Sequence, residues 1–149
     1  MASPRVEVGE GLLAQAFAAF GRCGRARREC VAYWTGPVGD PDRVDACLHP
    51  LHSASASHYE IDPRWLNETW RCLATERRQI RVQLHTHGHA AFHSNTDDLN
   101  PVVGTAGFLS LVIPGFASGE VGLEGAYLTE LGADGRWHER DPEKVLVMS

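Results

Sequence analysis

The segment from residue 80 to residue 87 constrains this chain more than any other, because its apolar and polar residues alternate strictly. Alternation with a period of two is typical of a β-strand. One face of this strand is expected to carry Ile80, Val82 and Leu84. The other face is expected to carry Arg81, Gln83, His85 and His87. The two imidazoles therefore leave the backbone on one side, at a separation that a single metal ion can bridge.

Paired imidazoles of this kind suit zinc, which takes neutral histidine nitrogens and carboxylate oxygens as ligands. A catalytic zinc normally keeps about three protein ligands and one water. The third ligand is expected to be Asp97 or Asp98, which follow after a short loop where the chain is predicted to turn into a helix. Coordination lowers the pKa of the bound water towards roughly 7, which supplies hydroxide near neutral pH. The segment thus indicates a zinc hydrolase site.

A hydrolase of this type also needs a carboxylate outside the metal's ligand shell to move protons. Glu29 is the candidate, because it precedes an apolar and aromatic run over residues 30–36 that has the length of a strand. Partial desolvation at the edge of such a run raises the pKa of a glutamate towards a useful catalytic value. Ser94 is expected to donate its hydroxyl to the oxyanion that develops on the substrate carbonyl.

Together these residues resemble the JAB/MPN metalloproteases that carry the JAMM motif, in the small bacterial form. The resemblance is to a glutamate well upstream, then His85-x-His87, then Ser94-x-x-Asp97. It implies that His85, His87 and Asp97 are zinc ligands, that Glu29 is the general acid and base, and that Ser94 is the oxyanion donor. It also implies a zinc peptidase or isopeptidase, with nearly the whole chain in one domain distantly similar in fold to the zinc nucleotide deaminases.

The chain departs from the family pattern at two places. Many members have proline directly after the second histidine, where this chain has Gly88, and the loop from His87 to Ser94 is slightly shorter. Neither departure removes a chemical group. The spacing to Ser94 favours Asp97 over Asp98 as the ligand.

Structural interpretations stand beside these roles. Residues 94–97 also fit a helix N-cap, with Ser94 capping and Asp97 in the first turn. The two histidines of the strand also fit a solvated strand surface, and a glutamate before a strand is often solvated. His89 and His93 are interpreted as loop residues, and the alternative is that they line the cleft or bind a second metal.

Other kinds of site find less support. The sequence has no His-Glu-x-x-His helix motif, no Pro-Cys-x-x-Cys motif and no glycine-rich phosphate loop of known spacing. The cysteines are too widely separated for a zinc ribbon and are interpreted as small core residues: Cys23, Cys30, Cys47 and Cys72.

Length and charge favour one domain over residues 1–149 with no membrane span. The formal net charge of −5 gives no footprint for nucleic acid. No apolar run of about 18 residues is present, and the N-terminal residues lack a secretory apolar core. The expected location is therefore cytoplasmic, where the cysteines are expected to stay thiols.

Local patterns predict an α/β fold with a curved mixed sheet flanked by helices. A helix is predicted over 11–20 with its end at Gly21, and a second one from Asp62-Pro63 with its tryptophans in the core. Strands are predicted over 30–36, 44–48, 80–87, 108–113 and 121–131. Residues 49–58 are predicted to form a polar loop.

The expected function is hydrolysis of an amide or isopeptide bond by a zinc peptidase. By resemblance, the expected substrate is the C-terminal tail of a ubiquitin-like protein, either in a conjugate or in a precursor, and E1-like and E2-like proteins are expected partners. A protease that trims a sulfur-carrier precursor is an alternative. A non-catalytic MPN scaffold that binds partners is another, and Glu29→Gln would separate it from an enzyme.

Overall fold

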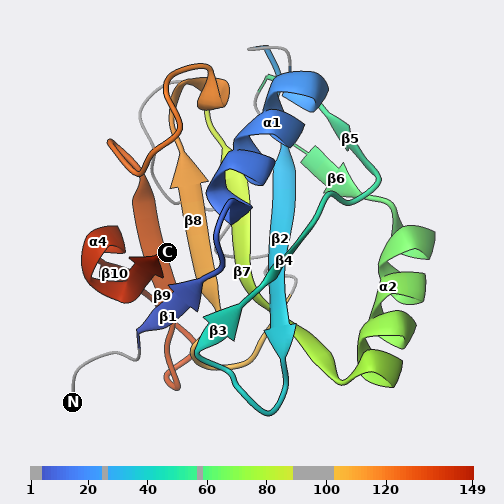
Figure 1. The fold of residues 1–149 in the computed structure, drawn as a ribbon. Helices are drawn as coiled ribbons and strands as arrows, with labels where there is room; N and C mark the ends of the chain where they lie inside the picture. The colour runs from blue at the N-terminus through green and yellow to red at the C-terminus, as the bar shows by residue number, and fades with distance from the viewer. Residues whose placement is uncertain (1–4, 25–26, 57–58, 89–102) are drawn as a thin grey trace.

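Two antiparallel strands, β2 (Val31–Pro37) and β7 (Arg78–Thr86), form the centre of the protein (Figure 1). The computed structural model describes residues 5–24, 27–56, 59–88 and 103–149. Both strands belong to a six-stranded sheet of order β10-β9-β8-β7-β2-β4. The other strands are β4 (Ala46–Leu48), β8 (Leu109–Ile113), β9 (Tyr127–Leu131) and β10 (Trp137–Arg140). Because β7 and β8 run parallel and the other pairs antiparallel, the sheet is mixed, as predicted.

Smaller elements flank this sheet. A parallel three-stranded sheet joins β11 (Leu146–Met148), β1 (Val6–Val8) and β3 (Arg43–Val44). A separate antiparallel pair is formed by β5 (His52–Ala54) and β6 (Tyr59–Ile61). The helices are α1 (Leu12–Gly24), α2 (Pro63–Glu76), α4 (Pro142–Val145) and the short 3-10 turn η1 (Gly115–Ala117). Figure 1 shows α1 lying across β2 and β7, while α2 stands to one side.

The central sheet is buried on both faces, and a different layer covers each. On one face, Trp34, Val82 and Leu84 pack in a cluster with α1 and with residues of β1 and β11. On the other face, Val31 and Tyr33 pack with Leu73 of α2. A strand in the middle of such a sheet has no solvated side, and its polar residues must therefore be satisfied inside the protein.

A β-bulge corrects the predicted face pattern of β7. The register between β2 and β7 shifts between Trp34 and Thr35, because Trp34 pairs with Val82 whereas Thr35 pairs with Ile80. The extra residue, Arg81, reverses the alternation. Val82 and Leu84 do share a face, but Ile80 packs on the opposite one with Val31 and Tyr33. The prediction that all three share a face was wrong for Ile80.

Helix α2 begins where the sequence predicted. Asp62 is its N-cap and accepts a hydrogen bond from the Trp65 backbone N–H at 2.9 Å, and Pro63 fills the first helical position. The prediction that both tryptophans are in the core was wrong for Trp70, which is 37% exposed. Trp65 is half-buried and lies beside Tyr33, with ring centroids 6.3 Å apart.

Several predicted boundaries also need correction. Helix α1 continues past Gly21 to Gly24, because the packing of Phe20 and Cys23 on the core outweighs the cost of one helical glycine, about 1 kcal/mol. The predicted strand over 44–48 is divided into β3 and β4, since the Asp45 N–H bonds to the Thr35 carbonyl between them. The predicted loop over 49–58 contains β5, and only β9 of the segment 121–131 is a strand.

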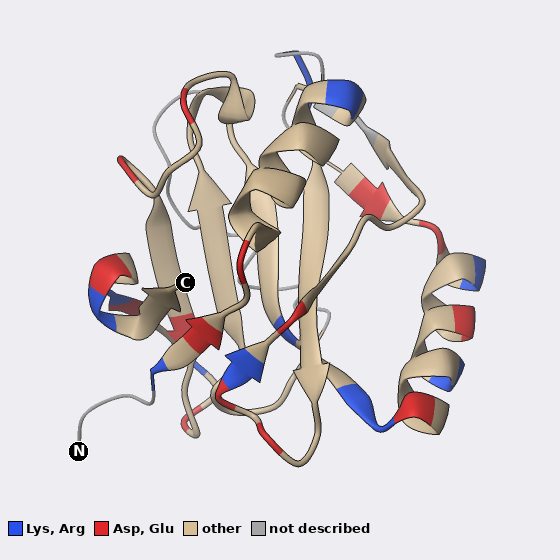
Figure 2. Cartoon of the chain, in the orientation of Figure 1, with Lys and Arg blue, Asp and Glu red and all other residues tan. Residues whose placement is uncertain are grey.

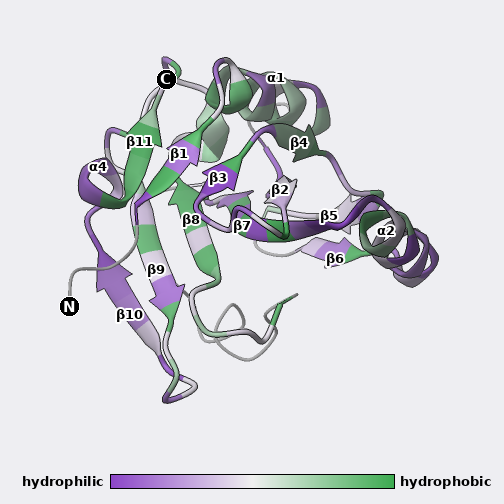
Figure 3. Cartoon of the chain, turned by 60° about the horizontal axis from the view of Figure 1, so that its bottom comes forward, coloured by the Kyte–Doolittle hydropathy of each residue, from purple (hydrophilic) through white to green (hydrophobic). Residues whose placement is uncertain are grey.

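Charge and hydropathy follow this layering. Figure 2 shows acidic and basic residues alternating along α2, and Figure 3 shows hydrophilic residues on α2 and β10 at the periphery. Hydrophobic residues dominate β8, which is buried throughout. Within the described residues, no helix has the length and apolar character needed to cross a bilayer.

Candidate active site

His85 and His87, here called the central histidine pair, lie side by side at the end of β7. Their ring centroids are 5.1 Å apart, and the rings are inclined at 49°. His85 is fully buried and His87 is 6% exposed. The prediction that one strand delivers two neighbouring imidazoles is met by this arrangement, although they lie in the protein interior and not on a solvated strand surface.

Backbone hydrogen bonds hold the central pair from both neighbouring strands. The His87 N–H donates to the Ile113 carbonyl of β8 at 2.9 Å. On the other side, the Thr86 N–H donates to the Cys30 carbonyl at 3.0 Å, and the Thr86 hydroxyl accepts from the Cys30 N–H at 2.8 Å. The chain just before β2 is thereby fixed against the end of β7. The backbone that carries the two imidazoles is thus held in place from both sides, as a preorganised site requires.

Glu29 lies at the same end of the sheet as the central pair. Its Oε1 atom is 3.9 Å from His87 Nε2, and its side chain is only 12% exposed. The strand register explains this position, because Val31 pairs with His85 and Glu29 lies two residues before Val31 on the same face. The Glu29 N–H donates to the Ser55 carbonyl at 2.7 Å, which anchors the backbone. The sequence named Glu29 as the candidate carboxylate, and the register between β2 and β7 brings it to the histidines.

A left-handed turn borders His87. The η1 residues Gly115, Phe116 and Ala117 have φ values of 63°, 53° and 55°. For Phe116 and Ala117 such angles are strained, by about 1–3 kcal/mol each, and strained backbone tends to cluster at functional sites. The Phe116 N–H donates to the His87 carbonyl at 2.8 Å, which couples the turn to the central pair.

The close approach of the Phe116 ring explains why a glycine, Gly88, follows His87. A Cβ atom at Gly88 would lie 2.7 Å from Cζ of Phe116, which is below any normal contact distance. Glycine therefore allows the Phe116 ring to lie against the chain directly after the second histidine. A proline in this position, as in many JAB/MPN proteins, would carry that Cβ.

Aromatic residues surround the central pair. The Tyr59 ring of β6 lies 5.6 Å from the His85 ring, and the Tyr59 hydroxyl accepts a hydrogen bond from Gln83 Nε2 at 3.1 Å. Tyr33 lies on the same face of the sheet, and burial raises the pKa of its hydroxyl well above the usual range. These neighbours limit water around the histidines, which strengthens electrostatic interactions there.

The remaining predicted site residues lie outside the described part of the chain. They are Ser94, Asp97, Asp98, His89 and His93. The structure therefore brings together Glu29, His85 and His87, and the roles of Ser94 and Asp97 stay predictions. The two buried imidazoles are ligands of the kind that zinc takes, so the described part of the site fits a zinc ion.

The sequence interpretation missed a second group of possible ligands. Cys23, His49 and His52 place their donor atoms within 4.8 Å of one another. The His-x-x-His spacing of His49 and His52 was a signal for this group, but it lies in a segment interpreted as a polar loop. The prediction that the cysteines remain thiols also needs correction, because Cys23 and Cys30 form a disulfide with Cα atoms 6.4 Å apart.

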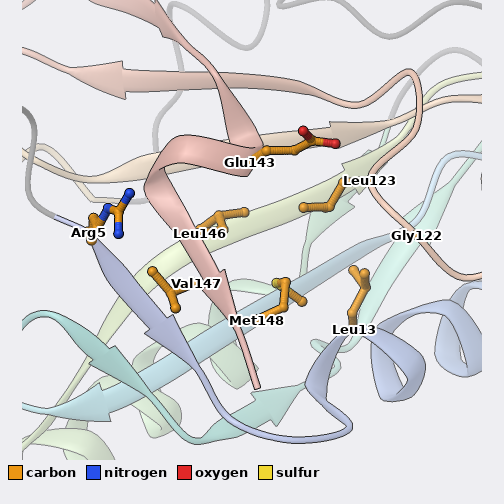
Figure 4. A pocket seen from close by; sticks show the side chains of 8 residues that line it. All are labelled: Arg5, Leu13, Gly122, Leu123, Glu143, Leu146, Val147 and Met148. Atoms are coloured by element: carbon orange, nitrogen blue, oxygen red, sulfur yellow. The ribbon is translucent and has the colours of Figure 1, made fainter.

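A pocket of about 560 Å³ opens in another part of the protein (Figure 4). Leu13 of α1 and Leu146 of β11 are among the residues that line it, and Arg5 and Glu143 carry charge at its edge. Among the described residues, Glu29, His85 and His87 do not line this pocket. We therefore assign it no part in the chemistry of the central pair.

Comparison with known proteins supports the resemblance inferred from the motif. No family model matches the chain. The chain is 40% identical over 68 residues to the probable metalloprotease y4jG of Sinorhizobium fredii, a match that spans 46% of this chain and 41% of that protein. The chain thus covers less than half of the length of this relative.

Solved structures match the whole fold. Protein DSY2949 from Desulfitobacterium hafniense superposes with a TM-score of 0.68 at 14% identity, over 97% of this chain and 92% of that one. A protein from Salinibacter ruber gives a TM-score of 0.60 at 18% identity, with 97% and 92% covered. AF2198, a JAB1/MPN domain protein from Archaeoglobus fulgidus, gives 0.55 at 11% identity, with 97% and 98% covered. These likenesses confirm the predicted α/β fold.

Proposed function

We propose that this chain, which has the fold of a JAB1/MPN domain and resembles that family, is a zinc-dependent peptidase. The observation that carries the proposal is the position of the Glu29 carboxylate, 3.9 Å from His87 Nε2 and beside a second buried imidazole. A buried carboxylate and two buried imidazoles are costly to assemble unless they have a function or a ligand. The name of the Sinorhizobium relative, a probable metalloprotease, agrees with this reading.

The central pair would hold zinc through its ring nitrogens, with Asp97 as the proposed third ligand. When bound, zinc polarises the substrate carbonyl and makes water a nucleophile near neutral pH. The backbone hydrogen bonds of His87 to Ile113 and Phe116 hold in place the chain that carries its ring.

Glu29 would move the protons of the reaction. Its carboxylate takes a proton from the attacking water and returns it to the leaving amine, so that the residue ends each cycle ionised again. Its backbone bond to Ser55 and the neighbouring bonds between Cys30 and Thr86 keep the carboxylate at a fixed distance from the central pair. Ser94 is proposed to stabilise the oxyanion by donating its hydroxyl.

The proposed substrate is the C-terminal tail of a ubiquitin-like protein, joined through an amide or an isopeptide bond. Such a tail is extended, and an extended chain is recognised mainly by hydrogen bonds to its backbone. Release from a conjugated lysine and trimming of a precursor differ only in the amine that leaves. The same residues would serve both reactions.

The first test is metal content. We expect the purified wild-type chain to carry about one more equivalent of zinc than a His85→Ala, His87→Ala double variant, as counted by elemental mass spectrometry. A Glu29→Gln variant should keep the wild-type metal content, because the glutamate is proposed to lie outside the ligand shell. Equal zinc in the wild type and the double variant would contradict the proposed ligands.

The second test is hydrolysis of a ubiquitin-like protein that carries an aminocoumarin amide at its C-terminus. Glu29→Gln should lower the rate by about 10²–10⁴-fold, the usual contribution of a general acid or base. Glu68→Gln on α2 is the matched control and should change nothing. Full activity in Glu29→Gln would remove the glutamate from the mechanism. A zinc-loaded wild type with no activity would favour the partner-binding scaffold.

A further inference from the structure

A second cluster of metal-ligating atoms lies near the central pair. His49 and His52, here called the peripheral histidine pair, have ring centroids 5.4 Å apart. Cys23, in the last turn of α1, places its Sγ 3.2 Å from His52 Nε2. All three donor atoms fall within 4.8 Å of one another. A zinc ion with ordinary Zn–S and Zn–N bonds would separate a sulfur and a nitrogen ligand by roughly 3.5 Å.

The tautomer of His52 is set by a backbone carbonyl. His52 Nδ1 lies 2.8 Å from the Pro50 carbonyl oxygen, which can only accept a hydrogen bond. The proton therefore resides on Nδ1, and Nε2 presents a lone pair towards Cys23. Ligand histidines in metal sites are fixed in this way, by donating their other ring N–H to a carbonyl or carboxylate.

The oxidation state of Cys23 decides whether its sulfur can interact favourably with the lone pair on His52 Nε2. In the disulfide with Cys30, the Cys23 sulfur has no proton to donate to Nε2. As a thiol it can donate its proton, and as a thiolate it can share a metal ion with Nε2. His52 Nε2 can therefore interact favourably with Cys23 only when Cys23 is reduced.

His49 suits the same role. Its donor atom lies within 4.8 Å of the donor atoms of Cys23 and His52, and its ring is 5.4 Å from the His52 ring. A neutral imidazole is the form that binds metal. One thiolate and two imidazoles form a donor set typical of zinc.

We propose that Cys23, His49 and His52 form a second metal site, for zinc or a similar divalent ion, which opens when the Cys23–Cys30 disulfide is reduced. The site does not depend on the proposed peptidase activity. It joins the end of α1 to the start of β5, and Ser55, directly after β5, accepts a hydrogen bond from the Glu29 N–H. Metal and disulfide compete for the same sulfur, so they stabilise two alternative states of this corner of the protein.

A phosphine reductant converts the disulfide state into the state that can bind metal. A phosphine breaks the S–S bond and is oxidised to the phosphine oxide, which takes its oxygen from one water molecule. The two protons of that water go to Cys23 and Cys30. The metal ion then replaces the Cys23 thiol proton, which is released to solvent.

The test uses Co²⁺ added to the full chain after treatment with a chelator. A thiolate ligand gives an intense sulfur-to-cobalt charge-transfer absorption, and the central pair, whose proposed ligands are nitrogen and oxygen, gives none. We expect this absorption in the phosphine-treated wild type and not in the oxidised wild type. His85→Ala, His87→Ala should retain it, which separates this site from the peptidase proposal. His52→Ala should weaken Co²⁺ binding by at least about 100-fold.

Cysteine variants identify the sulfur. Cys30→Ser should show the absorption even without reductant, because Cys23 then has no disulfide partner, and this variant keeps the inference testable if Cys23→Ser does not fold. Cys72→Ser, at an exposed free cysteine of α2, is the matched control and should behave as wild type. No absorption in the reduced wild type or in Cys30→Ser would overturn the proposal. An absorption that survives Cys23→Ser, or a His52→Ala variant that binds Co²⁺ as tightly as the wild type, would overturn it equally.

Discussion

The central and peripheral histidine pairs are built from the same side chain but supported in different ways. The central pair lies in the interior of a six-stranded sheet, where neighbouring strands fix its backbone. The peripheral pair lies before and within β5, where His49 is exposed and His52 half-buried. The comparison shows that neighbouring strands hold the backbone of the central pair on both sides. Under the proposal above, the peripheral pair instead depends on whichever bond, disulfide or metal, Cys23 makes.

Tyr59 lies between the two pairs. Its ring is 6.5 Å from the His52 ring and 5.6 Å from the His85 ring. Cys30, which bonds to Cys23, directly follows Glu29 in the chain. The peripheral pair is thus separated from the candidate catalytic residues by one ring and one peptide unit.

Two leucines offer the largest expected contrast between the pairs. Leu84 is fully buried and directly precedes His85, whereas Leu51 is 62% exposed and directly precedes His52. Leu84→Ala should lower the free energy of unfolding by about 2–5 kcal/mol, the usual cost of a cavity in a core. Leu51→Ala should change it by no more than about 0.5 kcal/mol. Urea unfolding of both variants measures this difference, and equal losses would mean that the peripheral pair is as firmly supported as the central one.

The hydrogen bond from the Cys30 N–H to the Thr86 hydroxyl gives the next largest effect. Thr86→Val keeps the shape of the side chain but leaves this buried N–H without its acceptor, at a cost of about 1–3 kcal/mol. Amide hydrogen exchange at Cys30 should become faster, because the end of β2 is released.

Thr75→Val is the matched control for that change. The Thr75 hydroxyl donates to the Arg71 carbonyl on the exposed surface of α2, where water can replace it. We expect little change in stability and none in exchange at Cys30. If Thr86→Val left Cys30 exchange unchanged, the link between the central pair and Glu29 would not depend on this hydroxyl.

The smallest expected effect is a loss of stability at high pH, caused by Tyr33 on the same sheet face as the central pair. Burial raises the pKa of Tyr33 in the folded state, whereas an unfolded tyrosine ionises near about 10. The unfolded state therefore loses the proton first, and stability falls as pH rises above that value. The loss should reach about 1 kcal/mol between about pH 10 and 11.

Tyr33→Phe isolates the contribution of the Tyr33 hydroxyl to this pH dependence of stability. The variant has no hydroxyl to ionise, so its unfolding free energy should fall less than that of the wild type across the same pH range. Parallel curves for the two proteins would show that the Tyr33 hydroxyl reaches water in the folded state.

The sequence predicted those parts of the fold that depend on local patterns. Asp62 and Pro63 mark the start of α2 because capping and a fixed φ act within one helical turn. Strands β1 and β11 were not predicted. Each has only three residues, and each is stabilised by pairing between opposite ends of the chain, a contact that leaves no local pattern.

For the candidate site, the sequence by itself determined which residues are the candidates for the chemistry and that His85 and His87 share one strand face. Strand periodicity and the spacing of the motif are properties of the chain alone. Only the tertiary structure decided that Glu29 reaches His87, because that contact depends on the register between β2 and β7. It alone also brought Cys23 to the peripheral pair, since a helix end and a distant loop meet only when both pack on the same sheet.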